Sequence, residues 1–360
     1  MSKRINAARI QPLLMQWYKK EARVLPWRSD PNPYYVWISE IMLQQTRVDT
    51  VMPYFLRFIA EIPTVRDLAD IDEEKLLKLW QGLGYYNRAL NLKKAAVMIV
   101  GKFGGSLPSG MKDLMSLPGI GVYTAGAISS IAFGRQVPAI DGNVLRIIAR
   151  ITAGREDIGN AKTKKLFEPV VAAMIPAEAP GDFNQALMDL GATICLPNGE
   201  PKCGQCPVNG LCEAYKKGLT SEIPVMSNKK ARRIEKKTVL LITCNNRFAL
   251  RKRGESGLLP NLWEFPNVEG YLTEEQCRQL LLNWGFTGCR ITELPPSRHI
   301  FTHLEWHMKG YFIRAAQLRG LSDFVWANKD EIKSRYSIPT AFKTIIKYAG
   351  ETIRNDFGKD

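Results

Sequence analysis

Histidine is scarce in this chain of 360 residues: the only three, His299, His303 and His307, fall within nine positions. Acid–base chemistry anywhere upstream must therefore use carboxylates, lysine or tyrosine. The N-terminal segment MSKRINAARIQPLLMQW lacks the continuous apolar core of a secretory signal, and no later apolar run approaches the length of a membrane span. These absences predict a soluble cytoplasmic protein without membrane association.

Acidic residues are few relative to basic ones, with 35 Asp and Glu against 50 Lys and Arg, and the pI is about 9.5. The resulting net charge of +15 favours a polyanionic partner, because each phosphate that a protein neutralises releases a counterion. A surface that is merely basic is the alternative. With 45% hydrophobic residues, the chain is long enough for two or three domains with cores of their own.

The spacing of apolar residues divides the chain into three parts. Residues 1–215 have apolar positions every three or four residues between Gly and Pro breaks, which predicts helices. Residues 216–237 contain the strongly basic string KKARRIEKK, which indicates an exposed linker. Residues 238–360 combine strand-like TVLLITC, FALRKR and GYFIRA with the helical TEEQCRQLLLNW, which is typical of a separate α/β or α+β domain.

Four of the seven cysteines are crowded into eighteen residues of a loop rich in Pro and Gly: Cys195, Cys203, Cys206 and Cys212. In a long intracellular chain this crowding indicates metal binding rather than disulfides. The spacing alone fits zinc and an iron–sulfur cluster equally well, and unligated buried thiols are a further alternative. The other three cysteines are interpreted as packing residues: Cys244, Cys277 and Cys289.

A glycine-rich turn, Leu117-Pro118-Gly119-Ile120-Gly121, separates two helical patterns. Glycine lets the backbone turn sharply and leaves amide N–H groups open at the start of the next helix, where the helix dipole favours an anion. An ordinary corner between two helices would have the same pattern.

Two carboxylates lie in settings that suit chemistry. Glu40, in the helical string WISEIMLQQT, has apolar neighbours whose desolvating effect would raise its pKa. Asp141, in VPAIDGNVLRI, directly precedes a helical pattern, so it is expected to cap that helix, to remain ionised as an electrostatic stabiliser, or both. A glutamate on a helix is otherwise usually a solvated surface residue.

Each histidine is four positions from the next, a spacing that could indicate a metal site. Their aromatic neighbours favour extended structure, and on a single strand the three side chains would be too far apart to share one ion. No metal site is predicted there.

Six strings follow one another along residues 25–212: LPWR, WISEIMLQQT, GLGYYNRA, LPGIGVYTAGAI, IDGNV and FNQALMDLGATIC. In this order they resemble the adenine DNA glycosylases of the endonuclease III-like helix-hairpin-helix superfamily. The resemblance implies a multidomain protein, with an all-α glycosylase region followed by an α/β domain. The helix-hairpin-helix would occupy residues 111–134, and residues 195–212 would hold a [4Fe–4S] cluster, although the first cysteine spacing is seven residues rather than the family's usual six.

The resemblance assigns chemical roles to residues at matching positions. Glu40 would protonate the adenine and later help activate water, while Asp141 would stabilise or briefly trap the cationic sugar. The other residues of the adenine pocket would be Tyr123, Asn143, Trp27, Arg28 and Gln185.

Contacts to DNA follow from the same resemblance. The residues beside the gap that base flipping leaves would be Gln45, Thr46, Leu83, Gly84 and Tyr85, although Leu83 and Tyr85 could also be plain core residues. The hairpin amides around Gly119 and Gly121 would hold a phosphate, often with a bound monovalent cation.

One position separates this chain from superfamily members that also cut the DNA backbone. Those enzymes carry a lysine two positions after the last hairpin glycine, where it forms a Schiff base. Here the residue is Tyr123, and no lysine occurs between Lys112 and Lys162. The resemblance therefore implies a monofunctional glycosylase without efficient lyase chemistry.

The C-terminal part resembles the Nudix fold through GLLPNLWEFPNVEG and CRQLLLNWGF. The Nudix hydrolase helix carries acids that hold Mg²⁺, but the matching residues 278–286 contain none, which favours a retained binding role over pyrophosphohydrolase activity. The string Phe301-Thr302-His303 resembles the Phe-Ser-His loop with which adenine DNA glycosylases recognise 8-oxoguanine. Threonine keeps the hydroxyl and adds a methyl group.

These resemblances imply a base-excision enzyme that acts as a monomer on double-stranded DNA containing adenine opposite 8-oxoguanine or guanine. Three other hypotheses remain at this point: a glycosylase for oxidised pyrimidines, a catalytically silent DNA-binding or redox-sensing module, and a nucleotide pyrophosphohydrolase.

Overall fold

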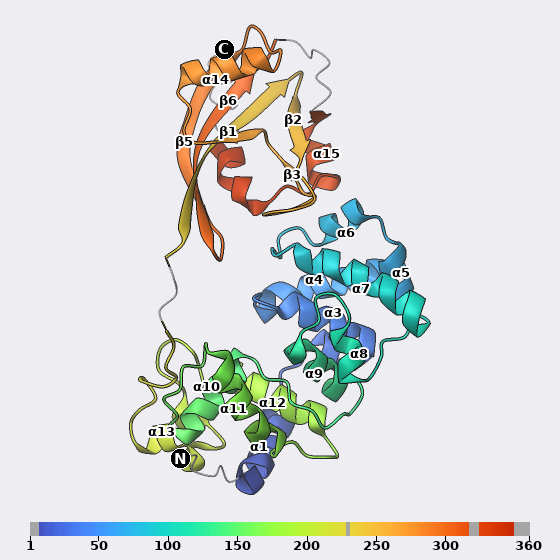
Figure 1. The fold of residues 1–360 in the computed structure, drawn as a ribbon, viewed down its shortest axis with the longest axis vertical. Helices are drawn as coiled ribbons and strands as arrows, with labels where there is room; N and C mark the ends of the chain where they lie inside the picture. Colours follow the sequence, from blue (N-terminus) through green and yellow to red (C-terminus); the bar gives the residue numbers. More distant parts are fainter. Residues whose placement is uncertain (1–6, 228–230, 317–323, 349–360) are drawn as a thin grey trace. The chain divides into compact units, whose positions relative to one another are not determined.

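The computed structural model describes residues 7–227, 231–316 and 324–348. The chain forms two compact units. Unit 1 consists of Met1–Asp70 and Asn91–Lys229, and unit 2 of Ile71–Leu90 and Lys230–Asp360. Figure 1 labels their helices and strands.

Unit 1 is helical throughout its described residues, as the three- and four-residue spacing predicts. Its helices α9, α10 and α1 pack on the central helix α12 (Pro180–Thr193), which is buried along most of its length. The bounds are α1 (Ala7–Glu21), α2 (Pro26–Ser29), α3 (Pro33–Leu43), α4 (Val48–Glu61), α5 (Val65–Asp70), α8 (Met111–Met115), α9 (Val122–Ile131), α10 (Gly142–Thr152), α11 (Ala161–Ala172) and α13 (Glu213–Lys216). Helix α7 (Asn87–Phe103) begins in unit 2 and continues in unit 1.

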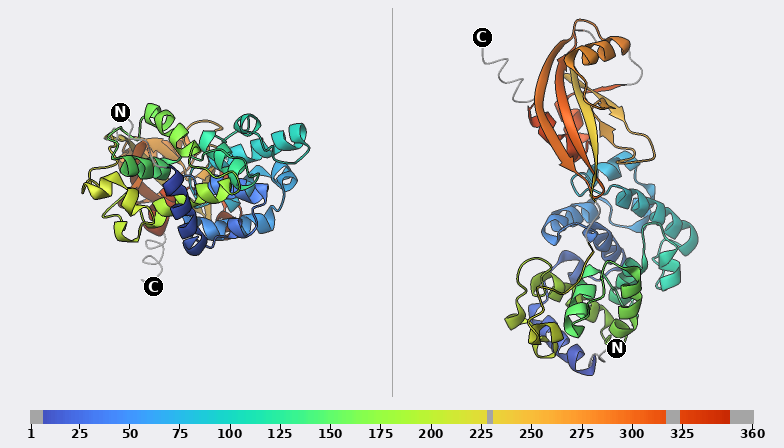
Figure 2. Two further views of the ribbon diagram at one scale, coloured as in Figure 1. Left: turned by 90° about the horizontal axis from the view of Figure 1, so that it is seen from below. Right: turned by 60° about the vertical axis from the view of Figure 1, so that its left-hand side comes forward.

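Unit 2 contains a mixed sheet with the strand order β3-β2-β1-β6-β5, in which β1 and β6 run parallel. The short strands β4 and β7 pair with β1 and β2. The right-hand view of Figure 2 shows the long strands side by side. Their bounds are β1 (Arg233–Cys244), β2 (Arg247–Lys252), β3 (Trp263–Glu264), β4 (Asn267–Glu269), β5 (Arg290–Ile300), β6 (Leu304–Arg314) and β7 (Val325–Ala327).

Both faces of this sheet are buried. Successive residues of β1 point to opposite sides, so this strand contributes to a hydrophobic core on each face. Leu240 and Ile242 pack with Cys277 and Leu281 of α14 (Glu274–Asn283). Val239 and Leu241 belong to a second core, which continues into residues 336–345 after α15 (Lys329–Ser334). The α/β character expected for this part of the chain is therefore confirmed, with Cys244 and Cys277 in the core as interpreted.

Residues 71–90 belong with the sheet unit although the sequence places them among the helices of unit 1. Helix α6 (Glu73–Leu79) explains this grouping. Lys78 Nζ donates to the carbonyl oxygens of Ile332 and Tyr336, both at 3.1 Å. Glu74 pairs with Lys252 at 2.9 Å.

The segment expected to be an exposed linker is shorter than residues 216–237. Strand β1 begins at Arg233, so the last five of those residues are part of the sheet. The pairing of Arg233 to Thr243 with β6 explains why, since a continuous parallel partner is available for this basic stretch.

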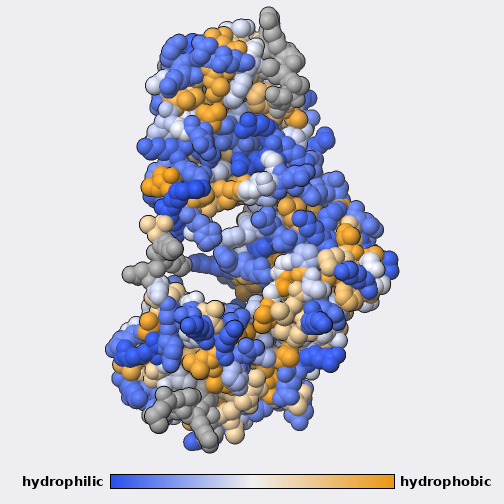
Figure 3. All heavy atoms as spheres, in the orientation of Figure 1, coloured by the Kyte–Doolittle hydropathy of each residue, from blue (hydrophilic) through white to orange (hydrophobic). Residues whose placement is uncertain are grey.

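Most of the surface visible in Figure 3 is hydrophilic, and hydrophobic residues appear there in scattered patches. None of the described helices is long and apolar enough to span a membrane.

Candidate active site

Glu40 lies on a helix that is buried almost all round. Tyr34 and all residues from Val36 to Met42 of α3 are buried, and α3 packs against α4 and α9. The Asn32 side chain caps the start of the helix by accepting a hydrogen bond from the Tyr34 N–H at 2.9 Å. The Glu40 side chain is 5% exposed, and its Oε2 atom has no hydrogen-bond partner among the described residues. The prediction that Glu40 has an apolar environment is confirmed.

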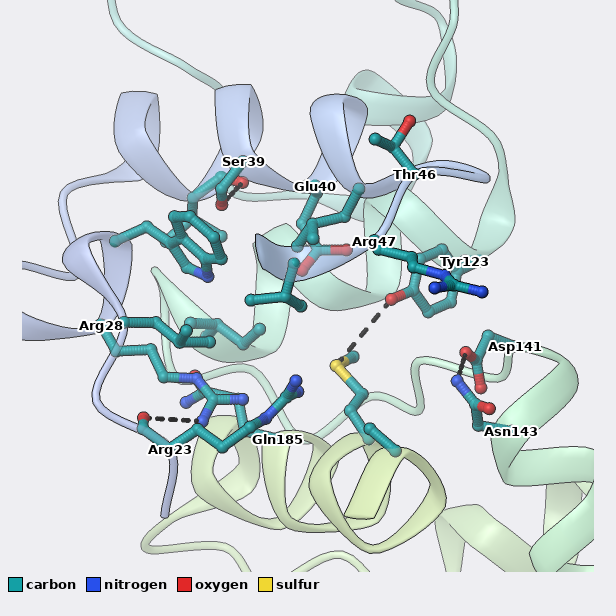
Figure 4. A pocket seen from close by; sticks show the side chains of 18 of the residues that line it. Arg23, Arg28, Ser39, Glu40, Thr46, Arg47, Tyr123, Asp141, Asn143 and Gln185 are labelled. Carbon is teal, nitrogen blue, oxygen red and sulfur yellow. Dashed lines mark hydrogen bonds between the residues drawn. The ribbon is translucent and has the colours of Figure 1, made fainter. Parts of the chain in front are cut away.

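The Glu40 carboxyl faces a pocket of about 420 Å³ in unit 1 (Figure 4). Six helices contribute to it: α2, α3, the start of α4, α9, the start of α10, and α12. Eight residues singled out from the sequence line this one cavity: Trp27, Arg28, Glu40, Thr46, Tyr123, Asp141, Asn143 and Gln185. The cavity is also lined by residues that the sequence analysis did not single out, among them Arg23, Ser39, Arg47, Asp49 and Met188.

The environment of Glu40 raises its pKa to about 7. Burial is the largest cause, because it penalises the charged form, and the charge of Asp141 adds to it. The Tyr123 hydroxyl and the Arg28 guanidinium oppose the rise. Below about pH 7 the carboxyl is therefore mostly protonated and can donate a proton to a bound group.

Asp141 is the N-cap of α10. Its Oδ1 accepts from the Val144 N–H and its Oδ2 from the Asn143 amide, both at 2.8 Å. Arg146 in turn donates to Asn143 Oδ1 at 2.9 Å. These donors favour the ionised form, but burial is the larger effect and raises the pKa of Asp141 above its ordinary value. The capping role is confirmed, and the expected stabilisation of the anion by N–H groups competes with desolvation.

Tyr123 and Gln185 complete the walls around the two carboxyls (Figure 4). The Tyr123 hydroxyl donates to Met188 Sδ at 3.8 Å, and burial raises its pKa well above the ordinary value, so the phenol stays protonated. The Gln185 amide makes no hydrogen bond to any described residue. It is therefore available as both donor and acceptor for a ligand.

An ion-pair network that the sequence analysis missed holds Arg28 at the pocket. Asp189, fully buried on α12, accepts from both Arg28 Nη1 and Nη2 at 2.8 and 2.9 Å, and from Arg23 Nε at 2.7 Å. Burial raises the pKa of Asp189, but Arg28 and then Arg23 hold it below the ordinary value. The signal was present in FNQALMDLGATIC, where Asp189 lies one helical turn after Gln185 and so on the same side of α12.

The glycine-rich turn connects α8 to α9. Gly119 has a φ of +80°, and a Cβ there would lie 2.9 Å from Asn91 Cβ, so the turn needs glycine at this position. Gly121 is the N-cap of α9 and provides no side-chain cap for the first N–H groups. These amides have the orientation of an anion site at a helix N-terminus.

The predicted DNA contacts at residues 83–85 and 301–303 meet within unit 2. The second group forms the turn between β5 and β6, and Thr302 is exposed. The hydroxyls of Tyr85 and Thr302 are 2.6 Å apart, so one donates to the other. Tyr85 is 46% exposed with a φ of +48°, and Arg88 supports its loop by donating to the carbonyls of Leu83 and Gly84. Tyr85 is therefore no core residue, whereas Leu83 is buried.

The other two predicted DNA contacts, Gln45 and Thr46, lie in unit 1 after α3.

The four clustered cysteines lie in the loop that follows α12. Every pair among them interacts electrostatically, which places the four sulfurs near one another. Arg150 Nη1 donates to Cys195 Sγ at 3.2 Å, and Arg146 Nε donates to the Cys195 carbonyl at 2.8 Å. In the described ranges no three His, Cys, Asp or Glu side chains form a single-ion site. Four neighbouring thiols with a cationic partner fit the donor set of an iron–sulfur cluster.

The sequence analysis considered the three histidines on a single strand, but they lie on the β5–β6 hairpin: His299 on β5, His303 in the turn and His307 on β6. His307 pairs across the hairpin with Arg298, one position from His299. Adjacent positions of a strand project to opposite faces, so the two rings are kept apart.

Two family models match the chain. Residues 38–172 match HhH-GPD superfamily base excision DNA repair protein, and residues 238–348 match the NUDIX domain. Curated relatives named adenine DNA glycosylase include those of Mus musculus, 35% identical over 84% of this chain and 70% of that protein, and Homo sapiens, 32% identical over 94% and 73%. The relative from Arabidopsis thaliana is 36% identical, and the match spans 55% of its length.

Solved structures resemble the helical part. A thermostable thymine-DNA glycosylase aligns with a TM-score of 0.53 and 28% identity, covering 59% of this chain and 97% of that protein. Endonuclease III in a non-covalent complex with DNA aligns with a TM-score of 0.51 and 26% identity, covering 59% and 98%.

The unusual pKa of Glu40 can be measured directly. Carbon-13 NMR of the glutamate carboxyls, with the signal assigned by its loss in Glu40→Gln, should give a midpoint near 7 rather than near the ordinary 4.5. Asp141→Asn should lower that midpoint, because it removes a neighbouring negative charge. A midpoint near 4.5 in the native protein would show that the carboxyl is solvated.

Stability should follow the same titration. Because the folded pKa exceeds the unfolded one, Glu40 costs stability progressively as pH rises from about 4.5 to about 7. The free energy of unfolding of Glu40→Gln should therefore improve relative to the native protein over this interval and stay level above it.

Proposed function

The chain belongs to the adenine DNA glycosylases of the HhH-GPD superfamily, and we propose that it removes adenine mispaired with 8-oxoguanine or guanine without cutting the DNA backbone. As a member of this family it is a DNA glycosylase of base excision repair, which hydrolyses N-glycosyl bonds. The observation that carries the finer proposal is the buried Glu40 carboxyl, which shares one pocket with Asp141.

The two carboxyls divide the work of breaking the glycosidic bond. Departure of the base leaves positive charge on the sugar and negative charge on the base. Glu40, whose pKa lies near 7, donates a proton to the adenine and then accepts one from the attacking water. Asp141 stabilises the cationic sugar as it forms, and its hydrogen bonds to Val144 and Asn143 hold its oxygens in position.

The remaining pocket residues select and hold the flipped base. Gln185 offers an amide with uncommitted hydrogen-bonding groups to the polar edge of adenine. Trp27 provides an apolar wall. Arg28 is held in place by Asp189 and also lines the cavity.

DNA is held on both sides of the flipped nucleotide. The amides at Gly119 and Gly121, with a monovalent cation, bind a backbone phosphate, as the uncapped start of α9 supports. Tyr85, with Leu83 and Gly84, and Gln45 with Thr46, fill the gap in the base stack. The exposure and positive φ of Tyr85 suit a side chain that leaves its loop to enter DNA.

The turn Phe301-Thr302-His303 recognises the 8-oxoguanine that remains opposite the gap. Thr302 is exposed, and its hydroxyl forms a hydrogen bond with the hydroxyl of Tyr85. The two side chains can therefore contact the same damaged base, one by hydrogen bonding and the other by stacking.

The reaction stops after base removal because no amine is available to attack the sugar. None of the described residues that line the pocket is a lysine, and Tyr123 stands where a Schiff-base lysine would be needed. Cys195, Cys203, Cys206 and Cys212 would hold a [4Fe–4S] cluster, which would fix the loop after α12 without entering the reaction.

Replacement of the proposed acid tests the mechanism. Glu40→Gln should slow adenine release in single-turnover assays by about 10²- to 10⁴-fold while duplex affinity is unchanged. Glu168→Gln is the matched control, since Glu168 is exposed on α11 and should release adenine at the native rate. Equal rates for the native protein and Glu40→Gln would refute the assignment.

The lesion preference is tested with duplexes containing adenine opposite 8-oxoguanine, guanine, cytosine or thymine. The first should react fastest. Thr302→Val keeps the side-chain shape but removes the hydroxyl, and should weaken the preference over A:G by about 2- to 10-fold. Thr302→Ser restores the hydroxyl and should retain the preference. If the valine variant prefers 8-oxoguanine as strongly as the native protein, Thr302 makes no lesion contact.

The absence of backbone cutting is tested by borohydride trapping. The native protein should leave an intact strand until alkali is added and should form no trapped adduct. Tyr123→Lys should form one, because an amine then occupies the pocket. Strand cleavage or trapping by the native protein would contradict the monofunctional proposal.

A further inference from the structure

Unit 2 contains a second hollow, of about 330 Å³, between the ends of β1 to β4. Figure 1 labels β1, β2 and β3, which pair side by side. Four of its lining residues are cationic and two are acidic: Lys237, Arg251, Lys252, Arg253, Glu264 and Glu269. The polar side chain of Asn267 contributes as well. Nothing in the proposed glycosylase reaction uses this hollow.

The unusual member of this set is Lys237. Its side chain is only 9% exposed, and its charge acts on the carboxylate of Glu235, two residues earlier on β1, which also accepts from Trp306 Nε1 and pairs with Arg233. The ammonium lies 4.9 Å from the centre of the Trp306 ring, which attracts a cation but does not neutralise it. Because Arg233 shares the Glu235 carboxylate, the buried ammonium is only partly neutralised, and this position favours an anion from solution.

The other charges leave the hollow positive. Glu264, 3% exposed, is shared between two guanidiniums: it accepts from Arg251 Nη2 at 3.3 Å and also pairs with Arg253. One carboxylate cannot neutralise both. Lys252 pairs with Glu74, outside the hollow, and Glu269 is exposed to solvent, which screens it.

We propose that this hollow is a phosphate-binding site, filled either by a phosphate of the DNA backbone or by the phosphates of a free nucleotide. The guanidinium forks of Arg251 and Arg253 suit two oxygens of one phosphate, and the Lys237 ammonium adds a point charge. No divalent cation is needed, since side-chain cations supply the neutralising charge.

Calorimetric titration of the full-length protein with pyrophosphate in the presence of EDTA is the primary test. One binding site is expected, and Lys237→Met should weaken it at least tenfold. Lys236→Met is the matched control, because it removes the same charge from the neighbouring, exposed position of β1. If Lys237→Met fails to fold, Lys237→Arg should bind and Lys237→Gln should not, and equal binding by these two variants would overturn the proposal.

Two further arms separate the sources of phosphate. Binding of pyrophosphate and deoxyguanosine monophosphate that depends on Lys237 identifies a free nucleotide. If the substitution weakens binding of an undamaged duplex alone, the source is the DNA backbone. In that case the slope of log Kobs against log salt should become less steep by about one in Lys237→Met. Indistinguishable behaviour of Lys237→Met and Lys236→Met in all three titrations would overturn the site. Adenine release at saturating enzyme should be native in both variants, which separates this test from that of the glycosylase proposal.

Discussion

The chemistry proposed for this protein depends on the removal of one carboxyl group from water. Helix α3 is buried from Val36 to Met42, and Glu40 on it has an oxygen without a partner among the described residues. Burying a carboxyl in this way penalises its charged form, and the nearby Asp141 penalises it further. The fold accepts this cost at one position, and the Asp189 network on α12 holds the facing cations in place.

Short-range patterns in the sequence predicted the settings of the two carboxyls, and the family resemblance supplied the other pocket residues. The apolar neighbours of Glu40 predicted its burial, and the Asp-Gly-Asn order after an apolar run predicted the cap at Asp141. The network of Arg23, Arg28 and Asp189 was missed, because it joins residues about 160 positions apart. The local pattern shows only that Asp189 lies on the same side of α12 as Gln185, and it does not show which cations pair with it.

Long-range pairing also decided where the units divide. Residues 71–90 have the same apolar spacing as the surrounding helices. In the folded chain, however, Lys78 of α6 donates hydrogen bonds to the carbonyls of Ile332 and Tyr336, which are distant in sequence. Likewise the basic string before residue 238 looks like a linker until β6 supplies a parallel partner. The histidines were interpreted on one strand because their aromatic neighbours favour extended structure, and that local preference does not show where the chain turns back at residues 301–303.

Arg146 gives α10 a second role besides presenting Asp141. Its guanidinium contacts the Cys195 carbonyl through Nε and Asn143 through Nη2, and Asn143 bonds the Asp141 carboxylate. Three successive hydrogen bonds thus join the backbone of the first cysteine to the anion in the pocket. Oxidative damage that displaced the Cys195 backbone would disturb the reactive centre through this relay, even though no sulfur lines the cavity except that of Met188.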